Sequence, residues 1–416
     1  MKLSLNQLQD PAFVAKIIPQ VQESLMNQPD NADLYLLMAT YNFQQGNIDL
    51  AEEFVKRAIG YDPTLGSYYV TYAAILGAQG KFDKAYEMLN HVYAKCKNVP
   101  ALNWNYALAL LGRGEFKLGW DLYRWRKVFI PGHNRMLQEE YRPSSVSNAK
   151  KTLLVWTEQG FGDQVMFFRF LRKAKERLSF GRVIFECPSE MYALFAENLE
   201  NVDAIYCQRP DWDTPMQFDE HISLMNLPYV FGLSDYKDHV SPKYLSAPEG
   251  PTKAWAQQME DDKDNFQGLK IGICWKGSST HQNDKQRSAK VGDFSPLAQF
   301  GCLVGLVLEG GDTIPDGMHI LNLTQGMVNA AYTASIIENL DIVVTVDTFV
   351  AHLAGAMGKK VFIILPYANE WRWGDGVGKS YWYEDVTLVK QPTPGDYASC
   401  VSTIVDHVAH SLSSSV

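Results

Sequence analysis

A repeat of 34 residues in the first third of the chain most strongly limits what this protein can fold into. Gly46, Gly80 and Gly114 follow one another at this interval. Each glycine lies in a short polar turn between two amphipathic stretches, and this pattern predicts one helical hairpin per repeat. Because a single hairpin cannot bury its own apolar face, the hairpins must stack into an array. The same interval separates small residues where two helices must approach closely: Ala39, Ala73 and Ala107, then Ala51, Ala85 and Gly119.

The repeats define the first predicted domain. Three units are recognisable between residues 32 and 130, and the stretch 11–27 is predicted to be a further helix that caps the array. We assign residues 1–135 to this helical region. Its role is open between a structural platform and a concave groove that holds a peptide or a glycan.

The pattern changes after a polar stretch at 131–150, which contains two prolines and is the predicted linker. Short runs rich in Val, Ile and Leu then alternate with helical stretches, which is typical of parallel sheets covered by helices on both faces. A gap at 236–268 divides these runs into two groups, so we expect two Rossmann-like lobes, 150–245 and 265–416, and a final helix at about 395–413. The predicted strands are "TLLVW" at 152, "RVIFE" at 182, "AIYC" at 204, "KIGICW" at 270, "CLVGLVL" at 302, "DIVVTVD" at 341 and "KVFIIL" at 360.

The charge balance narrows the range of partners. The chain has 38 Lys and Arg against 47 Asp and Glu, a net charge of −9, which argues against general binding to nucleic acid or to a membrane surface. Its six cysteines are scattered singly, a distribution typical of buried thiols in a reducing compartment. No apolar stretch approaches the roughly 20 residues that a membrane span requires. These features predict a cytoplasmic protein in which a local patch holds any anion.

The segment "WTEQGFGDQ" at 156–164 lies at the first predicted strand-to-helix turn. Gly160 and Gly162 permit a tight turn and a close approach of the backbone, and the amides at the helix start favour an anion or a polar substrate. The spacing lacks the third glycine of a dinucleotide-binding turn. Asp163 either caps the helix or faces the crevice as a general base, which the helix amides would keep ionised at neutral pH.

A strand, an Asp-Thr pair and a short helix follow one another in the second predicted lobe, at 341–357. Asp347 stands at the carboxyl end of the strand. The Thr348 hydroxyl and the free amides at the helix start would suit a pyrophosphate. His352 lies one helical turn farther along the same face. For His352, a structural role and a role at the phosphate site are both open.

The loop at 276–290 follows another strand of this lobe and carries a net charge of +3. A loop of this kind can simply be solvated, but its place at the carboxyl end of a strand favours an anion site. Its cations would offset a diphosphate without a metal ion. Since no HExxH motif or Cys/His cluster is evident, we expect neither a metal site nor a cofactor. The charged residues of the loop are Lys276, Asp284, Lys285, Arg287 and Lys290.

Trp371, Arg372 and Trp373 follow the last predicted strand. Their aromatic faces and guanidinium group suit stacking on a nucleotide base or a sugar. They suit packing between the lobes equally well, so both interpretations stay open.

Taken together, these motifs resemble known protein families. The helical repeats resemble tetratricopeptide repeats. The segments "EQGFGDQVMFFRFL", "GICWKG" with "NDKQRS", "VTVDTFVAHLAGAMGKKVFIILP" and "EWRWG" resemble the heptosyltransferase-like glycosyltransferases of family 9, which have a GT-B fold. The order of the parts is also similar to that of the O-linked N-acetylglucosamine transferases. The resemblance covers nearly the whole chain.

The resemblance also implies roles for individual residues. Asp163 matches the aspartate taken to be the base that acts on the acceptor hydroxyl. Two departures from the family pattern lie on the donor side: Glu309 and Gly310 stand where relatives carry a Gln-Lys pair, and "NAAYTASI" at 329 lacks the usual Asp-Thr-Ala-Ala helix start. The residues that match contacts to the donor's phosphates and sugar are Lys276, Lys285, Arg287, Asp347, Thr348 and His352.

The expected activity is therefore inverting, metal-independent transfer of a sugar from a nucleoside-diphosphate sugar to a hydroxyl group. Two other classes remain open: a binding protein that has kept the fold but lost turnover and acts through its repeats, and a sugar-nucleotide epimerase that acts on the donor alone. The expected partners are the donor and a glycan or protein acceptor in the repeat groove. The groove would also suit a second copy of the chain.

Overall fold

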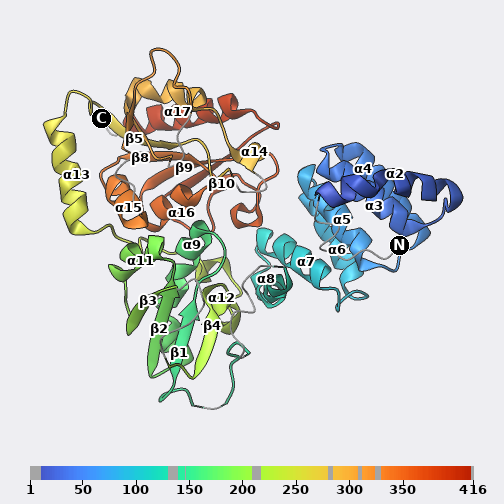
Figure 1. Cartoon of the computed structure of the whole chain (residues 1–416). Coiled ribbons are helices and arrows are strands. Elements are labelled where there is room, and N and C mark those ends of the chain that lie inside the picture. The colour runs from blue at the N-terminus through green and yellow to red at the C-terminus, as the bar shows by residue number, and fades with distance from the viewer. Residues whose placement is uncertain are drawn as a thin grey trace. The chain divides into compact units, whose positions relative to one another are not determined.

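The computed structural model describes residues 11–129, 139–145, 147–208, 217–279, 284–307, 312–323 and 329–413, without the side chains of Pro11, Lys285 and Asn322. The chain forms two compact units, Met1–Phe129 and Ile130–Val416. The first unit is helical, and the second contains two α/β lobes with parallel sheets (Figure 1). The predicted fold class, helical repeats followed by two Rossmann-like lobes, is confirmed.

Helical hairpins make up the first unit, coloured blue to cyan in Figure 1. The predicted turn glycines have φ angles of +80°, +70° and +78° at Gly46, Gly80 and Gly114, a conformation that glycine adopts without steric cost. The helices are α2 (Pro11–Asn27), α3 (Ala32–Gln44), α4 (Ile48–Tyr61), α5 (Gly66–Ala78), α6 (Phe82–Tyr93), α7 (Pro100–Gly112) and α8 (Phe116–Tyr123), followed by the 3₁₀ helix η1 (Arg124–Val128).

The periodic small residues lie in the core of the array, as the repeat predicts. Ala39 and Ala51 are fully buried and pack with Val55 and Ile75. The capping helix α2 covers the first hairpin and buries the apolar face that this hairpin would otherwise expose. The cluster between α2 and α3 contains Val14, Ile17, Ile18, Val21, Leu34, Leu37 and Met38.

The first lobe contains a parallel sheet whose described strands lie in the order β3–β2–β1–β4. Its central strand β1 is apolar and buried along most of its length, as expected for a strand covered on both faces. The helix α9 follows β1 across the glycine turn. The elements of this lobe are β1 (Thr152–Trp156), α9 (Phe161–Leu171), α10 (Ala174–Leu178), β2 (Arg182–Cys187), α11 (Ser189–Ala196), β3 (Ala204–Cys207), β4 (Glu220–Ser223), η2 (Leu224–Asn226), α12 (Leu227–Val230) and η3 (Tyr236–Asp238).

Part of the stretch predicted to be a linker packs on the first lobe. The Tyr141 amide donates to the His221 carbonyl oxygen at 2.8 Å, and the side chain of Asn148 donates to the Leu178 carbonyl oxygen at 3.2 Å. Tyr141 and Asn148 are both buried. The described residues 139–145 and 147–150 therefore contribute to the lobe.

The second lobe contains a larger sheet with the order β10–β11–β9–β8–β5–β6–β7 among the described strands, all parallel except β10. The predicted final helix is present as α17 and contacts β9 and β11 of this lobe. The elements are α13 (Glu249–Asp261), β5 (Leu269–Cys274), α14 (Asp284–Arg287), η4 (Val291–Phe300), β6 (Gly301–Gly305), β7 (Ile320–Asn322), α15 (Ala330–Glu338), β8 (Ile342–Val346), α16 (Phe349–Ala356), β9 (Lys360–Leu365), η6 (Trp371–Trp373), β10 (Gly378–Lys379), β11 (Val386–Lys390) and α17 (Tyr397–Ser413).

Arg169, near the end of α9, connects the two lobes. Its Nη1 donates to the carbonyl oxygens of His239, at 2.6 Å, and of Trp382 in the second lobe. Its Nη2 donates to the Tyr244 hydroxyl at 2.9 Å. The guanidinium carbon also lies 4.7 Å from the centre of the Tyr383 ring. Carbonyl oxygens and aromatic faces thus stabilise a buried positive charge where the lobes meet.

Candidate functional site

The strand order reverses once in each sheet, and the position of the reversal indicates where a ligand can bind. In the first sheet the chain moves outward from β1 in one direction and then places β4 on the other side of β1. In the second sheet the same reversal occurs between β5 and β8. Open parallel sheets bind ligands outside the carboxyl ends of their strands at such reversals. Most of the predicted site residues follow β1, β5 and β8, so they lie at these positions, while Trp371, Arg372 and Trp373 follow β9.

The packing of α9 on α16 brings the two predicted halves of the site together. A methyl group added to Gly162 would lie 2.8 Å from the His352 Cδ2 atom, so the glycine is required for this close approach. Phe161 and Phe349, at the starts of the two helices, make an edge-to-face contact with ring centres 6.3 Å apart. A methyl group added to Gly160 would meet only the Asp163 Oδ2 atom, at an ordinary 3.7 Å, and the predicted approach of a substrate to Gly160 stays a prediction.

Asp163, in the first turn of α9, forms an ion pair with Arg372 of the second lobe. The Asp163 Oδ1 atom accepts from Arg372 Nε at 2.9 Å and also from Nη2. The Arg372 Nη1 atom donates to Glu370. The side chains of Asp163 and Arg372 are 14% and 11% exposed, so solvent screens this pair less than a surface pair.

The sequence predicts that helix amides keep Asp163 ionised at neutral pH, and the structure adds further influences on its pKa. Burial raises the pKa of Asp163, and the Glu370 and Glu158 carboxylates add to that shift, while the Arg372 guanidinium opposes it. Burial is therefore the largest influence on the pKa of Asp163. A carboxyl group with a raised pKa is a stronger base than an ordinary aspartate.

His352 is buried next to α9. Its Nδ1 atom lies 2.9 Å from the Tyr383 hydroxyl, and its ring stacks on Trp373 with centres 5.0 Å apart. Burial, with smaller contributions from Arg372 and Arg169, lowers the pKa of His352 well below its usual value, so the ring is neutral at neutral pH. These contacts give His352 a structural role, and its predicted role in donor binding stays a prediction.

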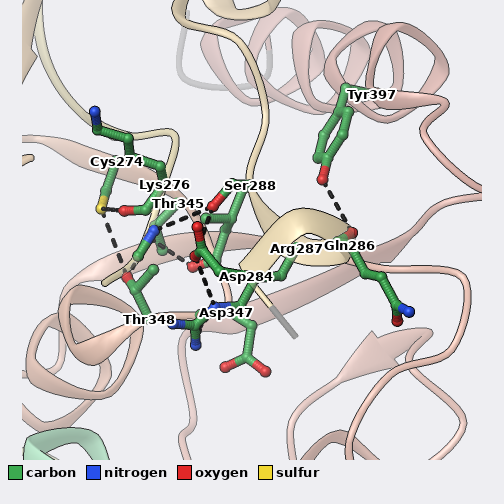
Figure 2. Close-up of polar contacts among 12 residues, drawn as sticks. Cys274, Lys276, Asp284, Gln286, Arg287, Ser288, Thr345, Asp347, Thr348 and Tyr397 are labelled. Atoms are coloured by element: carbon green, nitrogen blue, oxygen red, sulfur yellow. Dashed lines mark hydrogen bonds and ion pairs between the residues drawn. The ribbon is translucent and has the colours of Figure 1, made fainter. Parts of the chain in front are cut away.

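Thr348 precedes α16 at the reversal between β5 and β8, and Figure 2 shows it among polar side chains from both strands. Its Oγ1 atom lies 3.1 Å from the Thr345 Oγ1 atom and 3.6 Å from the Cys274 Sγ atom. No side chain caps the amides at the start of α16 in the described structure. The start of this helix thus keeps the polar character that the sequence predicts for a phosphate site.

Arg287, in the short helix α14, bridges the basic loop to this strand end. Its Nη1 donates to the Asp347 carbonyl oxygen at 3.0 Å, and its Nε lies 3.4 Å from Asp284 Oδ1 (Figure 2). The guanidinium group lies over Gly277, where an added methyl group would come within 2.8 Å of its Cζ atom. The Tyr397 hydroxyl of α17 donates to the Gln286 carbonyl oxygen at 3.2 Å. The closing helix therefore helps to hold α14 in place.

Asp347 is buried next to the contacts of Arg287, and Figure 2 shows its carboxyl group. Burial and the Glu370 carboxylate raise the pKa of Asp347 to about 7, against the opposing effects of Arg372, Trp373 and Arg287. The carboxyl group can therefore carry a proton near neutral pH. A protonated carboxyl group can donate a hydrogen bond to an anion, whereas a carboxylate would repel it.

Lys276 is paired with an acid that the sequence did not single out. Its Nζ atom lies 2.6 Å from Asp312 Oδ2, which also accepts from Trp275 Nε1 at 3.0 Å. Asp312 thus offsets part of the positive charge of the basic loop.

We expect Asp312→Asn to tighten binding of a nucleoside diphosphate about threefold, because asparagine still accepts from Trp275 but no longer neutralises Lys276. Isothermal titration calorimetry measures this change. Asp316→Asn, in the same exposed segment, is the matched control and should leave the affinity unchanged. Weaker binding to the Asp312→Asn protein would show that Lys276 does not face the anion.

Trp371, Arg372 and Trp373 form η6, which packs on the second lobe and reaches the first lobe through the Arg372 side chain. Trp373 is buried against His352, and the Arg372 carbonyl oxygen accepts from Trp382 Nε1 at 2.6 Å. The Trp371 ring meets the Trp382 ring edge to face, with centres 6.1 Å apart. These contacts support the packing interpretation, and stacking on a base or a sugar stays a prediction.

Some predicted features lie outside the described part of the chain. These are the Lys285 side chain and the departures at Glu309 and Gly310 from the family pattern.

Among the described residues, no group of three or more His, Cys, Asp and Glu side chains is arranged to hold a metal ion. No helix in the described ranges combines the length and apolar character needed to cross a membrane.

No protein family model and no curated protein matches the sequence. Among solved structures, the chain is similar to a glycosyl transferase family 9 protein from Veillonella parvula DSM 2008 (9% identity, 60% of this chain and 88% of that chain, TM-score 0.41). It is also similar to an O-GlcNAc transferase mutant from Thermobaculum terrenum (14%, 98% and 91%, TM-score 0.33) and to the TPR protein YrrB (13%, 31% and 66%, TM-score 0.25). The structures to which the chain is similar thus include the protein classes that its motifs resemble.

Proposed function

We propose that residues 130–416 form a glycosyltransferase that moves a sugar from a nucleoside-diphosphate sugar to a hydroxyl acceptor with inversion at the anomeric carbon. One observation supports this proposal most directly. The two predicted parts of the site, one in each lobe, lie next to each other. The acid Asp163 stands at the start of α9, and α9 packs on α16, whose start lies beside the cationic loop. A base on one side and anion-binding groups on the other are what displacement of a diphosphate needs.

In the proposed reaction, Asp163 removes the proton from the acceptor hydroxyl as its oxygen attacks the anomeric carbon. The bond from that carbon to the diphosphate breaks with its electron pair on the phosphate oxygen. Arg287 and the amides at the start of α16 stabilise the departing negative charge, and Lys276 adds to this in competition with Asp312. These side chains supply the required positive charge themselves, so we propose a reaction that needs no metal ion.

The basic loop supports a nucleoside diphosphate as the leaving group. The helix α14 presents Arg287 and the backbone of Lys285 at the strand reversal, and contacts from Asp284 and Tyr397 fix its position. We further propose that the repeats of the first unit hold the acceptor, a glycan or a protein, or associate with a second copy of the chain.

The direct test is a thermal-shift screen of nucleoside diphosphates, followed by transfer assays with the sugar derivatives of those that bind. A true ligand stabilises the folded state by an amount that grows with the logarithm of its concentration above Kd. Chromatography and mass spectrometry of donor and acceptor then separate three outcomes, since an isomerised donor keeps its mass and differs only in retention. A glycosylated acceptor supports transfer, an isomerised donor without acceptor indicates an epimerase, and stabilisation without chemistry indicates a binding protein.

A further inference from the structure

We infer that Arg372 is a positioning residue for the Asp163 base, so that the base is oriented by a side chain from the opposite lobe. This inference rests on the proposed function. From the sequence, Arg372 could either contact the substrate or pack between the lobes. Its geometry indicates instead that the guanidinium group serves the carboxylate of the first lobe.

The two contacts from Arg372 converge on one carboxylate oxygen. Nε, at 2.9 Å, and Nη2 both donate to Asp163 Oδ1. The other oxygen, Oδ2, accepts no hydrogen bond from any residue in the described ranges and lies on the side of Gly160. Fixing Oδ1 therefore orients Oδ2, which is the oxygen available to take the proton of an acceptor hydroxyl.

Arg372 is itself held in place by its neighbours. Its Nη1 donates to Glu370, and its carbonyl oxygen accepts from Trp382 Nε1 at 2.6 Å. The guanidinium carbon lies 4.7 Å from the centre of the Trp371 ring. All three guanidinium nitrogens thus face carboxylates, an arrangement that suits the support of a base better than the binding of a phosphate.

The two partners come from different lobes and are separated by 209 residues in the chain. The orientation of Asp163 therefore depends on the docking of α9 against the second lobe. The docking contacts include the close approach of Gly162 to His352.

Four charged or titratable groups surround Asp163. Glu158 comes from its own turn, Arg372 and Glu370 come from η6 and the residue before it, and the neutral ring of His352 comes from α16. Arg372 favours the ionised carboxylate, whereas Glu370 and Glu158 disfavour it. Removing Arg372 and neutralising Glu370 should therefore move the titration of Asp163 in opposite directions.

The test compares Arg372→Ala, Arg372→Lys and Glu370→Gln in full-length protein by pH profiles of kcat. The acid limb should move to higher pH in Arg372→Ala, because more of the base is protonated at a given pH, and to lower pH in Glu370→Gln. At pH 7 we expect Arg372→Ala to lower kcat roughly 10- to 100-fold through lost orientation, with the donor KM unchanged. Arg372→Lys keeps the charge and should return the acid limb toward that of the wild type.

A second readout does not depend on turnover. Carbon-13 NMR titration of the Asp163 carboxyl group should show a higher pKa in the Arg372→Ala protein and a lower pKa in the Glu370→Gln protein. If these shifts occur but no donor is turned over, the contact of Arg372 with the Asp163 carboxylate is confirmed, but the proposed function fails, and with it the role of Asp163 as a base. If neither substitution moves the titration, or if Arg372→Ala raises the donor KM tenfold with an unchanged pH profile, the inference is wrong.

Discussion

Asp163→Asn is expected to lower kcat for sugar transfer roughly 10³-fold, within the range that loss of a general base produces. The asparagine side chain has nearly the same size and can still accept from Arg372, but it cannot take a proton from the acceptor. Because Asp163 belongs to the first lobe and the anion-binding groups to the second, nucleoside diphosphate affinity should stay within about twofold of wild type. Steady-state kinetics and calorimetry on the same samples measure both quantities.

Glu190→Gln provides the matched control for Asp163→Asn. Glu190 is an exposed carboxylate at the start of α11 in the same lobe, so its loss should leave kcat and diphosphate affinity unchanged. If Asp163→Asn keeps wild-type turnover, or if it loses diphosphate binding instead of turnover, Asp163 is not the base.

Arg169→Met is expected to destabilise the second unit by about 3 kcal/mol, because each hydrogen bond to a charged group contributes about 1.5–3 kcal/mol and buried acceptors lose their partner. The side chain is 3% exposed and donates to the carbonyl oxygens of His239 and Trp382 and to the Tyr244 hydroxyl. Methionine fills part of the volume but cannot satisfy these acceptors. Urea denaturation followed by far-ultraviolet circular dichroism measures the loss.

Arg172→Met separates this effect from a general loss of positive charge. Arg172 follows α9 directly, but its side chain is 30% exposed and pairs with Glu200 on the surface. Surface ion pairs contribute about 1 kcal/mol or less, so this variant should unfold within that range of the wild type. Equal destabilisation by the two substitutions would contradict the role of Arg169 as the buried link between the lobes.

The sequence predicts most strands because most of them are buried on both faces. β1, β5, β8 and β9 each form a continuous apolar run, and such runs identify strands of a covered parallel sheet. The strands that the sequence did not predict are short, polar or alternating: β4 reads "EHIS", β7 reads "ILN", β10 reads "GK" and β11 reads "VTLVK". Local patterns of this kind do not differ enough from those of loops.

Topology also allowed the positions of the site residues to be predicted. Residues that follow parallel strands gather at one edge of a sheet, so Asp163, Thr348 and the loop of Arg287 could be placed without knowledge of any contact. The partners Asp312, Glu370 and Tyr397 could not, because each reaches the site from a segment without a recognisable pattern. The raised pKa of Asp163 could not be predicted, because burial depends on contacts between the lobes, and the sequence does not reveal those contacts.

The central claim is that Arg287 and the start of α16 hold a diphosphate opposite Asp163. A crystal structure of the protein with the nucleoside diphosphate that gives the largest thermal shift tests it most directly. We expect phosphate oxygens within hydrogen-bond distance of the Arg287 guanidinium group and of the amides that follow Thr348, with Asp163 facing them from the first lobe. A diphosphate bound elsewhere, with Arg287 turned away from it, would contradict the account.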